Sequence, residues 1–288
     1  MICGNRADMV LRIVTFTTGR SDALRSRTIM ALLSAKAWAP AGSTLHLVTD
    51  AADEYAWIAP QVELLTVTEA QLEEWKGRHR FFWRAKMEAV LHAAGDGQDD
   101  LLYIDSDTIT QRSLQELADG LQTGDAFMHL HEVDLATNSR RGNRELWSMV
   151  KGRSVAGVTF SAPCPMWNAG VIAVGRQRLG DLRRALTMLD GLSVDQPPHF
   201  VAEQLCFSIS LSTAGRLRPA EAWIDHYWGN KDGFDKLIHA RLGRWLARGT
   251  PWDAAMQELR RDPIIAPVMV RRRRWQEAAL RLIGLPNG

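Results

Sequence analysis

Cysteine is scarce in this chain, and a long apolar segment is missing. The three cysteines, Cys3, Cys164 and Cys206, are too few and too widely spaced for a disulfide framework or a cysteine-rich zinc site. No run approaches the roughly eighteen uncharged apolar residues that cross a bilayer, and residues 1–10 lack the apolar core of a secretory signal. We therefore expect the protein to work in the cytoplasm.

The chain also lacks internal repeats, low-complexity segments and the G-x-G-x-x-G signature of dinucleotide-binding folds. With 46% hydrophobic and 24% charged residues among 288, its composition is that of an ordinary globular protein. This composition does not indicate disorder. We expect one large α/β domain, or one domain with an appended subdomain.

The order of predicted strands and helices indicates an α/β fold. Residues 11–18 read as a strand, Ser21 or Asp22 caps a helix to about residue 38, and a second strand covers 44–49, which completes a β-α-β unit. Residues 131–165 are polar and are expected to be irregular, as an insertion or a substrate loop. Further strands are expected at 62–67, 101–104, 126–130 and 168–175, and further helices at 69–75, 81–94, 113–121, 179–192 and 202–212.

The most informative stretch is the apolar strand Leu101–Ile104, which runs directly into Asp105-Ser106-Asp107. Unpaired buried carboxylates are costly, so this pair must lie at the exit of the strand or hold a cation. Side chains two residues apart share a face of a strand, so both carboxylates can converge on Mn²⁺ or Mg²⁺. Such ions usually also bind substrate phosphate. The alternative from this stretch alone is that the two acids cap a turn.

Four other short motifs accompany this pair in a fixed order. Together they resemble the nucleotide-sugar-dependent glycosyltransferases of GT-A fold, and most closely the glycogenin and bacterial lipopolysaccharide galactosyltransferase group. The resemblance covers about residues 11–235 and implies a Rossmann-like, mixed and mainly parallel sheet flanked by helices. The motifs are Arg84-Ala85-Lys86, Trp167-Asn168-Ala169-Gly170-Val171, Glu203-Gln204 and His226-Tyr227-Trp228-Gly229-Asn230-Lys231.

The resemblance implies a metal site at Asp105, Asp107 and His226, where Mn²⁺, or Mg²⁺, bridges the two phosphates of the sugar donor. His226 belongs to an H-x-x-G-x-x-K pattern in which the lysine contacts the diphosphate. This chain departs from that pattern, because Lys231 follows Gly229 by two residues instead of three.

The resemblance also implies a donor site and a catalytic pair. Glu203 and Gln204 match the acid-amide pair beside the reacting sugar carbon of retaining relatives. If the enzyme instead inverts, Glu203 is the candidate general base, and a purely structural alternative is a first-turn carboxylate favoured by the helix dipole. The residues expected to contact the nucleotide, the phosphates or the sugar are Thr17, Thr18, Asp50, Arg84, Lys86, Ser106, Asn168, Ala169, Gly170, Gly229 and Lys231. Apart from the resemblance, the tryptophans Trp147, Trp167, Trp223 and Trp228 are candidates for stacking on acceptor sugar rings, with packing in the core as the alternative. Four side chains at or beyond the end of the predicted strand at 126–130 are also expected near the acceptor: His129, His131, Glu132 and Asp134.

The C-terminal part is strongly basic. From residue 236 on, eleven basic residues face four acidic ones, and we expect a division into a catalytic domain at 1–235 and a basic helical extension at 236–288. Arg271–Arg274 and Trp275 suit the anionic inner face of a membrane, which would present a lipid-linked or lipopolysaccharide acceptor. The alternative is a solvated run of charge. No nucleic-acid partner is expected, because no recognition module accompanies the basic residues.

Two other functions compete with sugar transfer. One is a haloacid-dehalogenase-like phosphatase, whose D-x-D motif also follows an apolar strand, although here the motif lies about a hundred residues into the chain and Ile109 stands where that family has Thr or Val. The other is a catalytically silent GT-A-like module that binds a nucleotide-sugar or a glycan. The altered spacing before Lys231 favours the silent module, and the retained Asp105, Asp107 and Glu203 favour an enzyme.

Overall fold

A seven-stranded sheet forms the centre of the computed structural model, which describes residues 10–267. β1 pairs in parallel with β2 and β4, β2 with β3, and β12 with β6, whereas β11 runs antiparallel to β4 and β6. The predicted mixed, mainly parallel sheet is thus confirmed. In spatial order the strands are β12 (Leu217–Pro219), β6 (Ala126–Met128), β11 (Val171–Val174), β4 (Asp100–Ile104), β1 (Leu11–Thr17), β2 (Thr44–Thr49) and β3 (Glu63–Thr66).

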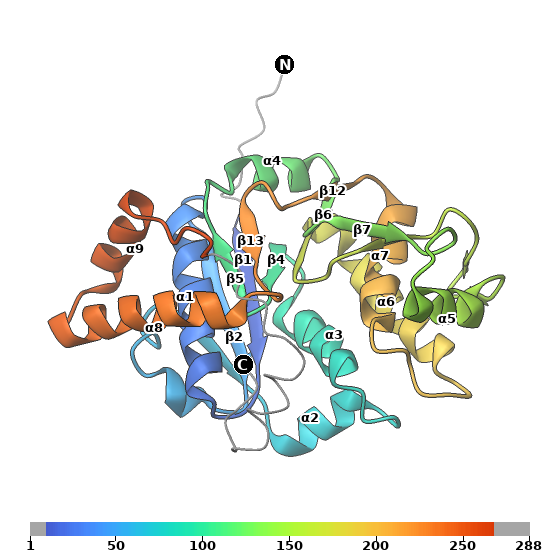
Figure 1. Ribbon diagram of the computed structural model, residues 1–288, viewed down its shortest axis with the longest axis horizontal. Coiled ribbons are helices and arrows are strands. Elements are labelled where there is room, and N and C mark those ends of the chain that lie inside the picture. Colours follow the sequence, from blue (N-terminus) through green and yellow to red (C-terminus); the bar gives the residue numbers. More distant parts are fainter. Residues whose placement is uncertain (1–9, 268–288) are drawn as a thin grey trace.

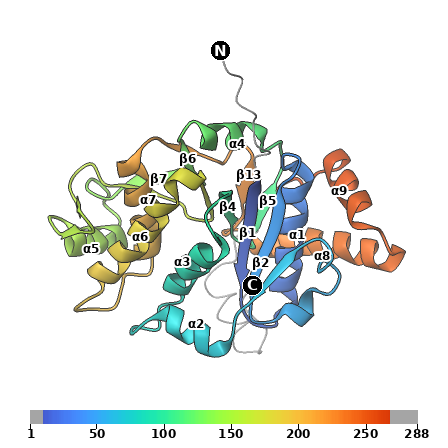
Figure 2. The same cartoon turned by 180° about the vertical axis from the view of Figure 1, so that it is seen from behind.

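Helices cover both faces of this sheet (Figure 1). One face carries α1 (Asp22–Trp38), α8 (Lys231–Arg248) and α9 (Trp252–Arg261), and the other carries α3 (Phe82–Ala93), α6 (Leu179–Leu192) and α7 (Ala202–Ala214). Figure 2 shows the same division from behind. Smaller helices are α2 (Glu69–Lys76), α4 (Gln115–Gln122) and α5 (Arg141–Val150), with 3-10 turns at Ala52–Tyr55 and Arg176–Arg178.

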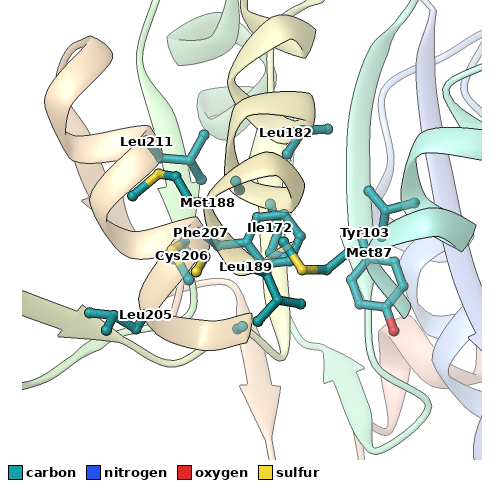
Figure 3. Packing of buried hydrophobic residues seen from close by; sticks show 14 of the residues in the cluster. Met87, Tyr103, Ile172, Leu182, Met188, Leu189, Leu205, Cys206, Phe207 and Leu211 are labelled. Atoms are coloured by element: carbon teal, nitrogen blue, oxygen red, sulfur yellow. The ribbon is translucent and has the colours of Figure 1, made fainter. Parts of the chain in front are cut away.

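The strands supply the two cores by simple alternation of side chains. In β4, Leu101 and Tyr103 belong to the core under α3, α6 and α7, whereas Leu102 and Ile104 belong to the core under α1, α8 and α9. Figure 3 shows Tyr103 in the first of these cores, together with Met87 of α3 and Met188 of α6. Burial on both faces explains why β4 is continuously apolar from Leu101 to its exit.

The predicted elements agree with most of the structure, but the expected irregular loop at 131–165 is wrong. That segment contains a helix and four short strands: α5, β7 (His131–Asp134), β8 (Ser154–Val155), β9 (Val158–Thr159) and β10 (Pro165–Trp167). The helix is mostly polar, and only Leu146 and Val150, four positions apart on one face, are buried. β10 pairs with β7 about thirty residues earlier, which local sequence does not encode.

The C-terminal helices pack onto the sheet domain. Phe234, Ile238, Leu242 and Trp245 of α8 belong to the same core as α1. The expected boundary after residue 235 lies inside α8 and stays a prediction, and the basic run Arg271–Arg274 lies outside the described residues. Within residues 10–267, every helix is too short or too polar to cross a membrane.

An ion pair ties α8 to α1, and we expect its loss to destabilise the fold. Arg27 Nε donates to Asp235 Oδ1 at 2.7 Å, and the two side chains are only 11% and 15% exposed. Asp235→Asn should lower the free energy of unfolding by about 1–3 kcal/mol, between the ranges for exposed and fully buried pairs, as measured by urea denaturation. The exposed pair of Arg20 and Asp53 is the control, and Asp53→Asn should be near neutral. Equal effects of the two variants would refute this prediction.

Candidate active site

The two aspartates lie in the turn between β4 and β5 (Thr108–Thr110), at the carboxyl end of the central strand. Three hydrogen bonds hold the turn. Asp105 N donates to Gly170 O at 2.8 Å, Thr108 Oγ1 donates to Asp105 O at 2.7 Å, and Tyr227 N donates to Asp107 O at 3.0 Å. Segments far apart in the chain therefore fix the position of both carboxylates.

β13 (Ile224–His226) brings a histidine to this turn. It pairs antiparallel with β5, and His226 lies opposite Thr108. His226 Nε2 is 3.3 Å from Asp107 Oδ1 and 3.8 Å from Asp105 Oδ2. Ligand atoms of Asp105, Asp107 and His226 all lie within 4.8 Å of one another. Two carboxylates and one imidazole are a donor set that Mn²⁺ accepts, so these residues fit a divalent cation.

The imidazole lies directly against a glycine. A Cβ on Gly170 would be 2.2 Å from His226 Cε1 and Nδ1, so no other residue fits at position 170 while the ring is in place. On another side, the ring of His129 packs edge-on against His226 with centroids 5.4 Å apart. Burial lowers the pKa of His129 to about 4, so that ring is neutral at physiological pH.

Lys231 reaches the same carboxylate as His226. Its Nζ is 2.9 Å from Asp107 Oδ2, and the Asp107 side chain is 7% exposed. Burial would raise the pKa of Asp107, but His226 and Lys231 together outweigh this effect and hold it well below its usual range. Despite the shortened spacing after Gly229, Lys231 thus lies beside the proposed cation site.

A second ammonium group, that of Lys86, contacts the other aspartate, Asp105. Lys86 is 2% exposed, and its Nζ is 3.2 Å from Asp105 Oδ1, 3.0 Å from Glu203 Oε1 and 2.8 Å from the carbonyl oxygen of Ala169. Burial lowers the pKa of Lys86, but the two carboxylates outweigh burial, and the pKa lies above its ordinary value. Tyr103 donates its hydroxyl to Asp105 Oδ1 at 2.7 Å.

Glu203 is almost completely enclosed beside Lys86. Its side chain is 6% exposed, and burial raises its pKa although Lys86 opposes the shift. The approach of Lys86 to Oε1 is an ionic contact without hydrogen-bond geometry. Gln204, the next residue, instead donates through Nε2 to Glu132 Oε2 at 2.8 Å.

These side chains surround one cavity of about 610 Å³. The residues predicted to bind the metal or the donor and the catalytic pair all line it, except Asp50, Arg84 and Gly229. Of the side chains expected near the acceptor, only Glu132 and Trp228 line it; the others, which do not, are His129, His131, Asp134, Trp147, Trp167 and Trp223. Its size suits a drug-sized or nucleotide-sized ligand. The structure therefore brings the predicted residues together from the carboxyl ends of β1, β4 and β13, from the segment just before β11, and from the first turns of α3 and α7.

The three exceptions have other surroundings. Asp50 Oδ1 accepts a hydrogen bond from Gly19 N at 2.8 Å and so holds the loop after β1. Arg84 donates through Nε to Asp190 Oδ1 at 2.7 Å and ties α3 to α6. Gly229 has no heavy atom within 4 Å of the place where a Cβ would be.

Other residues of the cavity wall were not among the predicted site residues. Tyr103 precedes Asp105 by two positions on the same strand face, so the period of two could have indicated it. Phe82, Trp83, Phe200 and Trp228 line the cavity while 39–67% exposed. Only Trp228 was expected near a substrate, because exposure of an aromatic residue cannot be read from the chain.

Comparison with known proteins finds similarity only among solved structures. No protein-family model and no curated protein matches the chain. The chain is similar to mouse xyloside xylosyltransferase 1 in its apo form, with 12% identity and a TM-score of 0.48 over 81% of this chain and 93% of that one. It is also similar to an active-site mutant of LgtC, with 16% identity and a TM-score of 0.46 over 73% of this chain and 72% of that one. Both are glycosyltransferases of GT-A fold.

Proposed function

We propose that the chain is a metal-dependent glycosyltransferase that takes a sugar from a nucleotide-diphosphate donor. The observation that carries the proposal is the cluster of Asp105, Asp107 and His226 inside the cavity, with Lys86 and Lys231 next to its carboxylates. Two carboxylates and an imidazole suit a divalent cation, and the partly exposed ammonium group of Lys231 beside them suits a diphosphate that arrives with it.

In this proposal the role of the cation site is to stabilise the leaving group, which is the nucleoside diphosphate. Asp105, Asp107 and His226 would hold a divalent cation, Mn²⁺ in our assignment, which would supply Lewis-acid stabilisation of the negative charge on the departing diphosphate. Lys231, 35% exposed and beside Asp107, has the freedom to turn toward a phosphate. Lys86 is 3% exposed and paired with two carboxylates, so its contribution is to hold Asp105 and Glu203 in place.

We assign retention of configuration at the sugar carbon. Glu203 is enclosed and in contact with Lys86, which leaves its carboxylate poorly placed to take a proton from an incoming hydroxyl. A front-face displacement does not need that base. The bond from the anomeric carbon to the diphosphate oxygen breaks, the bond to the acceptor oxygen forms, and the departing diphosphate accepts the proton of the acceptor hydroxyl.

The donor and acceptor classes belong to the proposal as well. We assign a UDP-sugar as donor and a glycan, lipid-linked or lipopolysaccharide molecule as acceptor. The basic segment at Arg271–Arg274 supports work in the cytoplasm at the anionic inner face of a membrane. Exposed aromatic side chains in the cavity wall, Phe200 and Trp228, suit the apolar face of a sugar ring.

Calorimetric titration tests the donor site. The full chain is titrated with UDP, GDP and CMP, each with Mn²⁺, with Mg²⁺ and with a chelator. We expect one nucleotide, UDP, to bind only when a divalent cation is present. Absence of binding by all three, combined with hydrolysis of a phosphomonoester, would replace this proposal by the phosphatase. Binding without any sugar transfer or donor hydrolysis would replace it by the silent module.

A further inference from the structure

Asn168 connects the candidate metal ligand His226 to Glu132, which also lines the cavity. The residue is 6% exposed and lies between β10 and β11. Its Oδ1 is 2.7 Å from His226 Nδ1 and accepts from Gly170 N at 3.0 Å, while its Nδ2 donates to Glu132 Oε1 at 3.0 Å. Both ends of the amide are therefore occupied within the protein.

The partners of Asn168 leave one orientation for its amide group. A backbone N–H can only donate, so Gly170 requires the oxygen on its side, and an ionised carboxylate can only accept, so Glu132 requires the nitrogen on the other. Glu132 is itself held, because its second oxygen accepts from Gln204 Nε2 at 2.8 Å. An amide oxygen facing His226 Nδ1 can only accept, which requires a proton on that ring nitrogen.

We propose that Asn168 and Glu132 are positioning residues that hold His226 as its Nδ1–H tautomer. The lone pair of Nε2 then points to Asp105 and Asp107, where a cation would be bound. Outer partners of this kind fix the tautomer and the ring plane of histidine ligands. This inference deepens the proposed function and rests on it. It also changes the role of Asn168, which the family resemblance assigns to the sugar pocket.

Affinity for Mn²⁺ alone, measured by electron paramagnetic resonance, tests the network without any need for turnover. Asn168→Leu keeps the size of the side chain and removes both polar ends, so Mn²⁺ should bind about 10–100-fold more weakly. Asn168→Asp keeps an acceptor for His226 but faces the carboxylate of Glu132, and it should also weaken binding.

A double variant that exchanges the hydrogen-bond donor and acceptor between positions 168 and 132 distinguishes a positioning role of Asn168 from simple packing. The double variant combines Asn168→Asp with Glu132→Gln, so the amide introduced at position 132 can donate to the carboxylate introduced at position 168. The oxygen of that amide still accepts from Gln204, so Mn²⁺ affinity should return to within a few-fold of the wild type. Wild-type affinity in Asn168→Leu, or no recovery in a folded double variant, would overturn the proposal.

The tautomer itself can be observed in the metal-free protein. Long-range ¹H–¹⁵N correlation spectra, with the His226 signals identified by their loss in His226→Gln, should show the proton on Nδ1 when the ring is neutral. A proton on Nε2 alone would overturn the network. A wild-type protein that binds no Mn²⁺ would instead refute the proposed function, and the tautomer measurement would still decide what Asn168 does.

Discussion

Replacement of Asp107 by asparagine is expected to remove cation-dependent nucleotide binding and to lower sugar transfer by about 10³-fold. Asp107 is the most enclosed carboxylate of the cluster and lies next to both His226 and Lys231. The amide has nearly the same shape but no charge. Lewis-acid stabilisation of a leaving group is worth several kcal/mol, and each 1.36 kcal/mol is a factor of ten in rate, which gives the size of the expected loss.

A matched variant separates this effect from a general loss of stability. The side chain of Asp125 is 11% exposed against 7% for Asp107, and it is paired with Arg218 at 3.1 Å outside the cavity wall. Asp125→Asn should change the free energy of unfolding but leave metal-dependent nucleotide binding intact. Asp107→Asn should still unfold cooperatively in a thermal scan while calorimetry shows no metal-dependent binding. Turnover near the wild-type level in Asp107→Asn would refute the assignment of the cluster.

The parts of the fold that were predicted correctly are those whose signals are local. The strand before Asp105 is apolar because both of its faces are buried, and the helix from Asp22 begins at a Ser21 cap and ends before Pro40. β5, β7, β10 and β13 are only three or four residues long and pair across up to about 120 residues. Such strands exist because of tertiary contacts, so residue patterns do not reveal them.

The site shows the same limit at the level of side chains. Asp105 and Asp107 follow from the end of one strand, but His226 reaches them only through the β5–β13 pairing, and from the chain alone it required the family resemblance. Arg84 was expected at the phosphates, yet it pairs with Asp190, 106 positions away. A long cationic side chain binds the nearest available carboxylate, and the sequence does not say which one that is.

Gly170 is a different case: it matters because it has no side chain, and the ring of His226 occupies the space where a Cβ would be. We expect Gly170→Ala to displace the imidazole of His226 and to weaken Mn²⁺ binding by about 10²-fold, the usual cost of moving a critical group by about 1 Å. The new Cβ would be 2.2 Å from two ring atoms, so the ring cannot keep its place beside the carboxylates. The same overpacking should lower the free energy of unfolding by about 1–3 kcal/mol.

Two other glycines test whether this loss comes from the contact with His226. Gly243 lies in α8 with no heavy atom within 4 Å of its absent Cβ, so Gly243→Ala should keep Mn²⁺ affinity and stabilise the helix by about 0.5–1 kcal/mol. Gly229 belongs to the motif that contains His226 but is equally open, so Gly229→Ala should also bind Mn²⁺ normally. If Gly170→Ala bound Mn²⁺ as well as these two variants, His226 would not be a ligand in the position described. If Gly229→Ala alone lost Mn²⁺ binding, the cation would be bound near the loop that contains Trp228 and not beside Asp105 and Asp107.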